Sequence, residues 1–349
     1  MQLKITLPIL TIFVFIQITF GHQMPAHADE SIFQPAIAWG GTKVIKKGSW
    51  GDLVSQGISK FEAKTNVSVH QVFAEEMDDY VAQIEKLAEE GYSPIIMTTS
   101  APKSKKKLEQ IIDRYPDRRF ILTNGAYSIP NGFFIIFAYQ ETSFLAGYSA
   151  ARKSKTGKVG FIGGVDIPVI RDYLCGYIKG VHYANPDIDV LFDFVGDGFK
   201  GWNDKPRAAE LANLQIDNGA DIIYTAAGAS GPGALEAAHK RGKLGIGVDK
   251  NQNDLFPGSV LTSTVVHVDN TIYRALLASY HNVWGEQLKL FGLQEGAIEL
   301  AFDEHNAPLI SPELKLEIAL VQEDIILKKI SLPRYTEPES CLLGGNILF

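Results

Sequence analysis

Short apolar runs alternate with amphipathic segments along most of the chain. The amphipathic segments repeat apolar residues every three or four positions, as at Val81, Ile84 and Leu87, which predicts helices that pack on a sheet. The predicted strands are 34–39, 67–73, 94–99, 120–123, 133–139, 158–163, 190–195, 221–226, 244–248 and 297–302, with a further apolar segment at 260–266. The predicted helices are 52–64, 78–90, 103–115, 142–153, 170–184, 205–218, 233–241, 270–284 and 312–328. This order indicates an α/β fold in which helices cover both faces of parallel sheets.

The predicted strands are more numerous than one open sheet of this kind usually holds. We therefore predict two doubly wound parallel-sheet lobes, with the change from one to the other near Gln140. The segments after residue 260 must complete both lobes, so the chain crosses between them more than once and forms a hinged ligand cleft. The predicted limits are residues 29–139 plus 267–300 for the first lobe, 140–266 plus 301–330 for the second, and 331–349 for a C-terminal tail.

The first 28 residues have the three parts of a secretory signal peptide. Lys4 precedes the apolar run 5–20, and Ala26 and Ala28 form a small-x-small cleavage site. The run is shorter than the roughly 20 residues that a bilayer span needs, which favours a cleaved signal peptide over a membrane anchor. No cysteine lies near the cleavage site, so we expect no lipid anchor. We therefore expect an exported, periplasmic protein from which residues 1–28 are removed.

Composition excludes several classes of protein. Hydrophobic residues make up 46% of the 349 residues and charged residues 21%, which argues against a disordered, collagenous or polytopic membrane protein. Acidic residues outnumber basic ones by 40 to 33, so we do not expect a nucleic-acid-binding surface. Two cysteines, Cys175 and Cys341, are too few for a disulfide framework or a four-cysteine zinc site. They can pair in an oxidising compartment, or Cys175 is a small buried helix residue, and the sequence leaves both open.

Ligands of open α/β sheets bind beyond the carboxyl ends of the strands, so the loops that follow strands are the candidates for a site. Three of the four tryptophans, Trp39, Trp50 and Trp202, lie in such loops. Two of them begin similar motifs at predicted helix starts, Trp50-Gly51-Asp52 and Trp202-Asn203-Asp204. If the two indoles face each other across the cleft, each stacks on a flat ring with about 1–3 kcal/mol, by analogy with base–aromatic stacking.

Simpler interpretations of these loops remain open. Each tryptophan can pack onto its own lobe, and Asp52 and Asp204 can be helix N-caps. Asp249 ends a predicted strand, where a carboxylate accepts hydrogen bonds from paired hydroxyls, as with ribose in dinucleotide folds, or caps the next turn.

The segment 228–231 lets a ligand approach the backbone at a helix start but lacks the Gly-x-Gly-x-x-Gly spacing and the Gly-Lys-Ser/Thr ending of phosphate loops. No His-Glu-x-x-His, Gly-x-Ser-x-Gly or Cys-His arrangement is present, so we expect no enzyme, no metal site and no cofactor.

At these loops the sequence resembles the basic membrane protein family. These are periplasmic or lipid-anchored substrate-binding proteins of ABC importers, among them purine nucleoside receptors. The likeness runs from about residue 34 to residue 269, and its best stretches are 141–147, 156–164, 219–223 and Gly247-Val248-Asp249 with Gln252. The resemblance implies a periplasmic-binding-protein-like fold of type I, with three crossovers between the lobes.

The resemblance also implies roles for single residues. Trp50 and Trp202 match the two stacking phenylalanines of the family, and Asp249 matches its ribose-binding aspartate. Asn124 stands where the family has an aspartate that reads the purine edge, and Val266 replaces a lysine. An amide both donates and accepts hydrogen bonds, whereas a carboxylate only accepts, so Asn124 favours a different base or planar ring. The predicted ligand-binding residues are Trp39, Ser49, Trp50, Asp52, Asn124, Trp202, Gly228 and Asp249.

We therefore expect a monomeric binding protein without chemistry. It takes a nucleoside-like ligand between Trp50 and Trp202, closes its lobes and presents the closed form to the permease of an ABC transporter. A sugar or autoinducer receptor of the same fold is the alternative, because aromatic rings also stack on pyranoses. An exported nucleoside hydrolase is a third interpretation, but it needs an acidic cluster or metal site that the sequence does not contain.

Overall fold

The computed structural model describes residues 33–40, 45, 47–98, 105–123, 131–283 and 288–336. The predicted signal peptide of residues 1–28, the predicted ligand residue Asn124, and Cys341 lie outside these ranges. Within them, no helix has both the length and the apolar character needed to cross a lipid bilayer.

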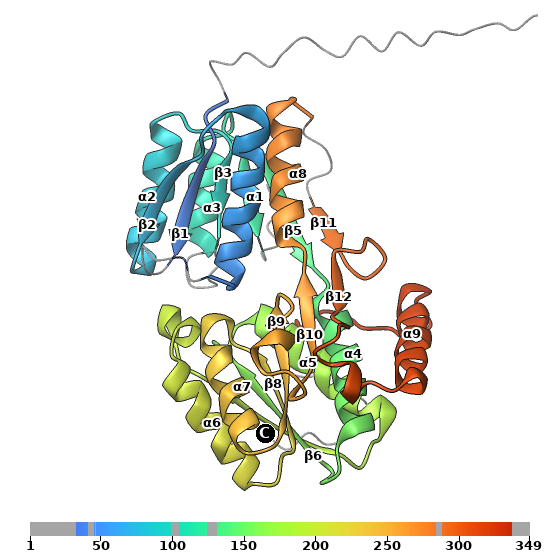
Figure 1. Ribbon diagram of the computed structural model, residues 1–349. Helices are drawn as coiled ribbons and strands as arrows, with labels where there is room; N and C mark the ends of the chain where they lie inside the picture. Colours follow the sequence, from blue (N-terminus) through green and yellow to red (C-terminus); the bar gives the residue numbers. More distant parts are fainter. Residues whose placement is uncertain are drawn as a thin grey trace, which may run out of the picture.

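Strands and helices alternate as the hydrophobic pattern predicts (Figure 1). The strands are β1 (Ala36–Gly40), β2 (His70–Ala74), β3 (Ile95–Met97), β4 (Phe120–Thr123), β5 (Gly132–Phe137), β6 (Lys158–Gly163), β7 (Asp189–Phe194), β8 (Ile222–Ala226), β9 (Leu244–Asp249), β10 (Val260–Val266), β11 (Leu288–Phe291) and β12 (Ile298–Leu300). The α-helices are α1 (Trp50–Thr65), α2 (Met77–Glu89), α3 (Lys105–Arg114), α4 (Tyr139–Lys153), α5 (Pro168–Ala184), α6 (Lys205–Asp217), α7 (Gly231–Lys240), α8 (Val268–Tyr280) and α9 (Pro312–Ile326). Short 3₁₀ helices follow several strands: η2 (Gly198–Trp202), η3 (Gly228–Ser230), η4 (Asn253–Leu255) and η5 (Ala307–Leu309).

The strands form two six-stranded sheets, one in each lobe. The first sheet has the order β11-β5-β4-β3-β1-β2 and is parallel throughout. The second has the order β12-β10-β9-β8-β6-β7 and is parallel except for β12, which runs antiparallel to β10. The prediction of an α/β fold with two parallel-sheet lobes is confirmed.

The chain passes between the sheets three times, which positions the loops at the carboxyl ends of the strands. It leaves the first sheet after β5, returns after β10 through α8, and crosses again between β11 and β12. In Figure 1, α8 packs beside α1 in the upper lobe, while α4, α5 and α9 lie in the lower lobe.

Two details of the predicted lobes need correction. Strand β12 pairs with β10 of the second sheet, so the assignment of residues 267–300 to the first lobe is wrong for its last strand. The chain turns back after β11, and the short β12 reaches the other sheet. Strand β11 was not predicted at all. The other predicted residue limits of the two lobes and of the tail stay predictions.

The start of the predicted C-terminal tail is fixed to the second lobe. The Asp172 carboxylate in α5 is fully buried and accepts hydrogen bonds from Arg334 Nε at 3.0 Å and from the backbone N–H of Tyr335 at 2.5 Å. Gln140 at the start of α4 donates to the Leu332 carbonyl at 3.2 Å. Cys175, one turn after Asp172, is 2% exposed and disulfide-bonded. Residues 331–336 therefore pack across the beginnings of α4 and α5.

Helices α4 and α5 approach each other so closely that three positions have no room for a side chain. A Cβ built on Gly180 lies 1.9 Å from the Phe144 carbonyl oxygen, and one built on Gly147 lies 2.1 Å from the Tyr177 carbonyl oxygen. Gly176 meets α4 in the same way. Gly147 belongs to the stretch 141–147 that carries the family resemblance, so that part of the likeness reflects packing.

We expect Gly180→Ala to destabilise the protein by about 1–3 kcal/mol, because the new methyl group must push a helix backbone aside. Gly51→Ala in α1 is the matched control, since the nearest heavy atoms to a Cβ there are 3.7 Å away. That substitution should be neutral or stabilising by up to about 1 kcal/mol, because alanine is the better helix former. Urea unfolding of both variants measures the difference, and equal stabilities would contradict the close packing.

Candidate functional site

The two lobes touch where the first turn of α1 meets the loop that follows β9. The Asp249 carboxylate ends β9 and accepts a hydrogen bond from the backbone N–H of Trp50, the first residue of α1. Beside this contact Gly48 lies against the Lys250 side chain, since a Cβ built on Gly48 lies 2.4 Å from Lys250 Nζ. α1 belongs to one lobe and β9 to the other (Figure 1), so the carboxyl ends of both sheets contribute to this region.

The first turn of α1 is organised by its own side chains. Ser49 is the N-cap, and its hydroxyl accepts the Asp52 backbone N–H at 3.3 Å. The Asp52 carboxylate in turn accepts the Gly48 backbone N–H at 2.7 Å and Gln56 Nε2 at 3.1 Å. The first N–H groups of a helix have no partner within the helix and carry partial positive charge. The N–H of Trp50 is one of these, and Asp249 supplies its partner from the other lobe.

The Trp50 indole lies partly buried beside this contact. Its Nε1 is buried and has no hydrogen-bond partner in the part of the chain that the structure describes. A buried donor without a partner is unfavourable, and in a native structure it calls for an explanation. A ligand atom that accepts a hydrogen bond would provide one.

Asp249 occupies an apolar and aromatic environment. It is 8% exposed, and burial raises the pKa of its carboxyl to about 7, although the hydrogen bond from Trp50 lowers it. Tyr173 and Tyr224 lie close enough that the Asp249 charge contributes, after burial, to the raised pKa of each hydroxyl. Tyr224 bonds to Ser143 and Thr264 at 3.0 Å each. Tyr173 and Tyr224 are both uncharged, so neither supplies a positive charge to the Asp249 carboxylate.

Trp202 ends the 3₁₀ helix η2 and packs over two glycines of its own lobe. A Cβ built on Gly164, after β6, would lie 2.5 Å from Trp202 Cε3, and one on Gly228, after β8, would lie 3.6 Å from the same atom. Gly228 has a φ of +53°, a conformation that glycine adopts without strain. One face of the indole thus packs on its own lobe, as the simpler interpretation predicts, and the ring remains partly exposed.

Ser230 fixes the backbone on both sides of Trp202. Its hydroxyl is fully buried, donates to the Gly201 carbonyl at 2.9 Å and accepts the Asp204 backbone N–H at 2.6 Å. Asp204 is the N-cap of α6, because its side chain accepts the Arg207 backbone N–H at 2.9 Å. The N-cap interpretation is therefore confirmed for Asp204 and wrong for Asp52, whose helix is capped by Ser49.

The predicted site residues fall into groups. Trp50 and Asp249 meet across the lobes, and Trp202 contacts Gly228. Ser49 and Asp52 hold the start of α1.

Trp39 is 5% exposed, donates from Nε1 to Gln71 at 2.9 Å and stacks on Phe73, so it packs inside the first lobe. That each predicted residue contacts a ligand directly stays a prediction.

Sequence reasoning missed Lys250, Tyr173 and Ser230. Lys250 directly follows Asp249, and Ser230 lies within the glycine-rich segment 228–231, so their positions beside predicted residues were a usable signal. Tyr173 lies in the helix α5, where the sequence does not distinguish an aromatic residue of a binding site from one of the hydrophobic core.

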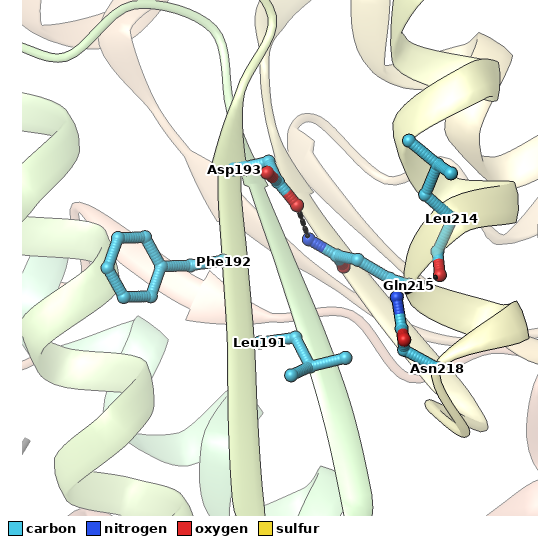
Figure 2. Close-up of a pocket in the computed structure, with 6 residues that line it drawn as sticks. All are labelled: Leu191, Phe192, Asp193, Leu214, Gln215 and Asn218. Carbon is cyan, nitrogen blue, oxygen red and sulfur yellow. Dashed lines mark hydrogen bonds between the residues drawn. The ribbon is translucent and has the colours of Figure 1, made fainter. Parts of the chain in front are cut away.

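The described residues also form a separate cavity of about 280 Å³ between the edge strand β7 and α6 (Figure 2). Figure 2 shows Leu191 and Asp193 pointing toward α6, while Phe192 points to the other side of the strand. Gln215 Nε2 donates to Asp193 at 2.7 Å and to the Phe161 carbonyl at 3.0 Å. Its donors therefore attach α6 to the sheet, and the cavity lies at a sheet edge rather than at strand ends.

Among the described residues, no group of three or more His, Cys, Asp and Glu side chains is arranged to hold a metal ion. The groups near the strand ends that can contact a ligand include the Asp249 carboxylate, the first N–H groups of α1 and the indoles of Trp50 and Trp202. Carboxylates and N–H groups form hydrogen bonds with polar atoms, and indoles stack on flat rings.

Comparison with known proteins gives a family and a set of relatives. A family model described as "ABC transporter substrate-binding protein PnrA-like" matches residues 41–336. The chain is 35% identical to basic membrane protein A of Borreliella burgdorferi over 230 residues, 64% of this chain and 66% of that protein. It is 35% identical to basic membrane protein A of Borreliella afzelii over 202 residues, 56% of this chain and 60% of that protein. These matches span less than two thirds of the two relatives.

Solved structures with the same fold include a solute-binding protein of an ABC transporter system from Aeropyrum pernix K1. Its TM-score is 0.75 at 20% identity, with 88% of this chain and 95% of that chain covered. A transcriptional activator of the comK gene from Bacillus halodurans has a TM-score of 0.69 at 22% identity, with 86% and 100% covered. At such identities the likeness concerns the fold alone.

We expect Asp249→Asn to be more stable than the wild type above neutral pH. The carboxyl titrates near 3.8 when unperturbed and near 7 in the folded protein, so the folded state holds the proton more tightly. The wild type therefore loses stability as the pH rises from 3.8 to about 7. Asparagine cannot ionise, and its advantage reaches about 4 kcal/mol at most above pH 7 and disappears below pH 4.

Urea unfolding at about pH 4, 5.5 and 8 measures this dependence. Asp187→Asn, on the exposed turn after α5, removes the same charge at the surface and is the control. A stability difference between Asp249→Asn and wild type that does not change with pH would contradict the buried carboxyl.

Proposed function

Since the chain belongs to the family of PnrA-like ABC transporter substrate-binding proteins, we propose that it binds a nucleoside or a similar planar heteroaromatic molecule between its lobes and delivers it to an ABC permease. The observation that carries this proposal is the contact of the Asp249 carboxylate with the first turn of α1. That contact joins the carboxyl ends of both sheets, where ligands of this fold class bind.

Two tryptophans supply the aromatic surfaces. Trp50 stands at the start of α1 in the first lobe, and Trp202 ends η2 in the second. Trp202 is supported from behind by Gly164 and Gly228, so its remaining face is the one available for stacking. In the proposed complex the flat ring of the ligand lies between the two indoles, with Asn124 at its edge. An acceptor on the ligand pairs with Trp50 Nε1.

Asp249 supplies the polar recognition. A carboxylate has two oxygens with about four acceptor positions, and the Trp50 N–H occupies one of them. The others accept hydrogen bonds from two neighbouring hydroxyl groups, such as those of a ribose. A ligand donor placed there also replaces the solvation that burial removes from Asp249.

Closure of the lobes is the proposed signal to the permease. A ligand shifts the equilibrium between open and closed lobes only by its difference in affinity for the two forms. Contacts made from both lobes, by Trp50 on one side and by Trp202 and Asp249 on the other, exist together only in the closed form. We further propose that the protein acts as a monomer in the periplasm, after removal of residues 1–28.

We expect Trp50→Ala and Trp202→Ala each to weaken nucleoside binding by about tenfold to a hundredfold, because each removes about 1–3 kcal/mol of stacking. Trp50→Phe keeps an aromatic ring but removes the N–H donor, so it should lose less. Tyr183→Ala, which removes an aromatic ring that is 52% exposed on α5, is the control. Isothermal titration calorimetry with adenosine, guanosine, inosine and uridine provides the affinities.

The same titrations include ribose, galactose and a furanosyl autoinducer. Binding of nucleosides that is insensitive to both tryptophan substitutions would remove the stacking model. Binding of a sugar or autoinducer, but of no nucleoside, would identify a receptor of that other class.

A double-mutant cycle tests the role of Asp249. Removal of the ribose 3′-hydroxyl should weaken binding to the wild type by about tenfold, the order expected for a hydrogen bond to a charged group. With Asp249→Asn the same change in the ligand should matter much less, because the charged acceptor is gone. Equal losses in both proteins would show that the hydroxyl is recognised elsewhere.

A further inference from the structure

Asp249 is held in a strained backbone conformation. Its φ is +69°, a value that residues other than glycine rarely adopt. The Lys250 backbone N–H donates to the Val248 carbonyl at 2.8 Å, so Asp249 is the central residue of the rare γ-turn with positive φ. Such a conformation persists only where the surrounding structure enforces it.

Buried polar side chains after the turn and on β10 hold it in this conformation by hydrogen bonds. Gln252 Oε1 accepts the Val248 backbone N–H at 3.0 Å, and the Gln252 backbone N–H donates to Ser263 Oγ at 3.0 Å. Ser263 Oγ in turn donates to Asn253 Oδ1 at 2.9 Å. Gln252 is 3% exposed, and Asn253 and Ser263 are fully buried. These bonds tie both sides of the turn to β10.

Asp303 connects this network to the segment after β12. One of its carboxylate oxygens accepts Asn251 Nδ2 at 2.5 Å and Asn253 Nδ2 at 3.0 Å. The other accepts the backbone N–H groups of His305 at 2.8 Å and Asn306 at 3.3 Å. Burial raises the pKa of Asp303, but these hydrogen bonds outweigh it and hold the pKa below its usual value. The residue is therefore an ionised acceptor at neutral pH.

We propose that Asp303 is a positioning residue for Asp249, acting through Asn251, Asn253 and Gln252 to keep the carboxylate of the γ-turn directed at the first turn of α1. The role in ligand binding rests on the function proposed above. Without Asp303, residues 251 and 253 lose their common acceptor, and the strained turn relaxes toward negative φ. The Asp249 carboxylate then moves away from Trp50 and becomes more exposed to water.

The test compares Asp303→Asn with Asp221→Asn. Asp221 is a matched control, because it also accepts several loop hydrogen bonds, from Ser154 Oγ at 2.8 Å and from the backbone N–H groups of Lys155 and Thr156 at 2.6 and 3.1 Å. Asp221 lies just before β8, whereas Asp249 ends β9, so the control residue is at the opposite end of the second sheet from Asp249. Any general effect of losing a loop-fixing carboxylate appears in both variants.

Two measurements are made on each full-length protein. The first is the titration of the Asp249 carboxyl by ¹³C nuclear magnetic resonance, which needs no ligand. It should move from about 7 toward the ordinary value of 3.8 in Asp303→Asn, and stay unchanged in Asp221→Asn. The second is calorimetric binding of adenosine and guanosine, which should weaken about tenfold in Asp303→Asn alone, as the loss of one or two hydrogen bonds predicts.

The outcomes separate the two proposals. If the wild type binds neither nucleoside, the proposed function fails for these ligands, and the titration alone decides the positioning role. If Asp303→Asn leaves both the Asp249 titration and the nucleoside affinity at wild-type values, the positioning role is overturned. Should Asp303→Asn fail to fold, Asn251→Ala replaces it, because Asn251 is exposed and its loss removes only one bond to Asp303. A smaller shift of the Asp249 titration in the same direction is then expected.

Discussion

The hydrogen bond between the Asp249 carboxylate and the backbone N–H of Trp50 is the interaction on which the candidate site depends. A helix start needs acceptors for its unpaired N–H groups, and the Ser49 hydroxyl accepts that of Asp52 from within the first lobe. The second lobe supplies another. Because the same carboxylate is proposed to bind the ligand, ligand binding at Asp249 would be coupled to the distance between the lobes.

The surrounding structure limits how the groups of the second lobe can move. Trp202 lies over Gly164, where a Cβ would come within 2.5 Å of the ring, and touches Gly228, while Ser230 bonds to the backbone on both sides of it. Asp249 is fixed by its γ-turn and by the buried residues around Gln252. Side chains held in this way lose little conformational freedom when a ligand binds, which favours affinity.

Hydrophobic periodicity was sufficient to predict most of the fold. Strand β6 has the predicted limits, β10 coincides with the apolar segment 260–266, and α6 ends one residue earlier than predicted, because each is a continuous apolar or amphipathic segment with polar flanks. Strand β11 is only four residues long and contains a lysine, so its pattern is too weak to be recognised.

The partner of β12 and the roles of Ser230 and Asp303 depend on contacts between distant segments, which local patterns do not encode. Asp52 stands at the start of the predicted helix and is a possible N-cap there, but Ser49, three positions earlier, is an equally good capping residue and caps the helix.

The unfavourable features of the site are informative about its ligand. A buried carboxylate with a raised pKa and a buried indole N–H without a partner among the described residues both reduce stability, and they lie on the two residues that meet between the lobes. One requires hydrogen-bond donors and the other an acceptor. A hydrocarbon ring satisfies neither, and a simple carboxylic acid would set a second negative charge beside Asp249. A flat ring that carries an acceptor and is joined to a polyol satisfies both at once, which supports the nucleoside-like ligand proposed above.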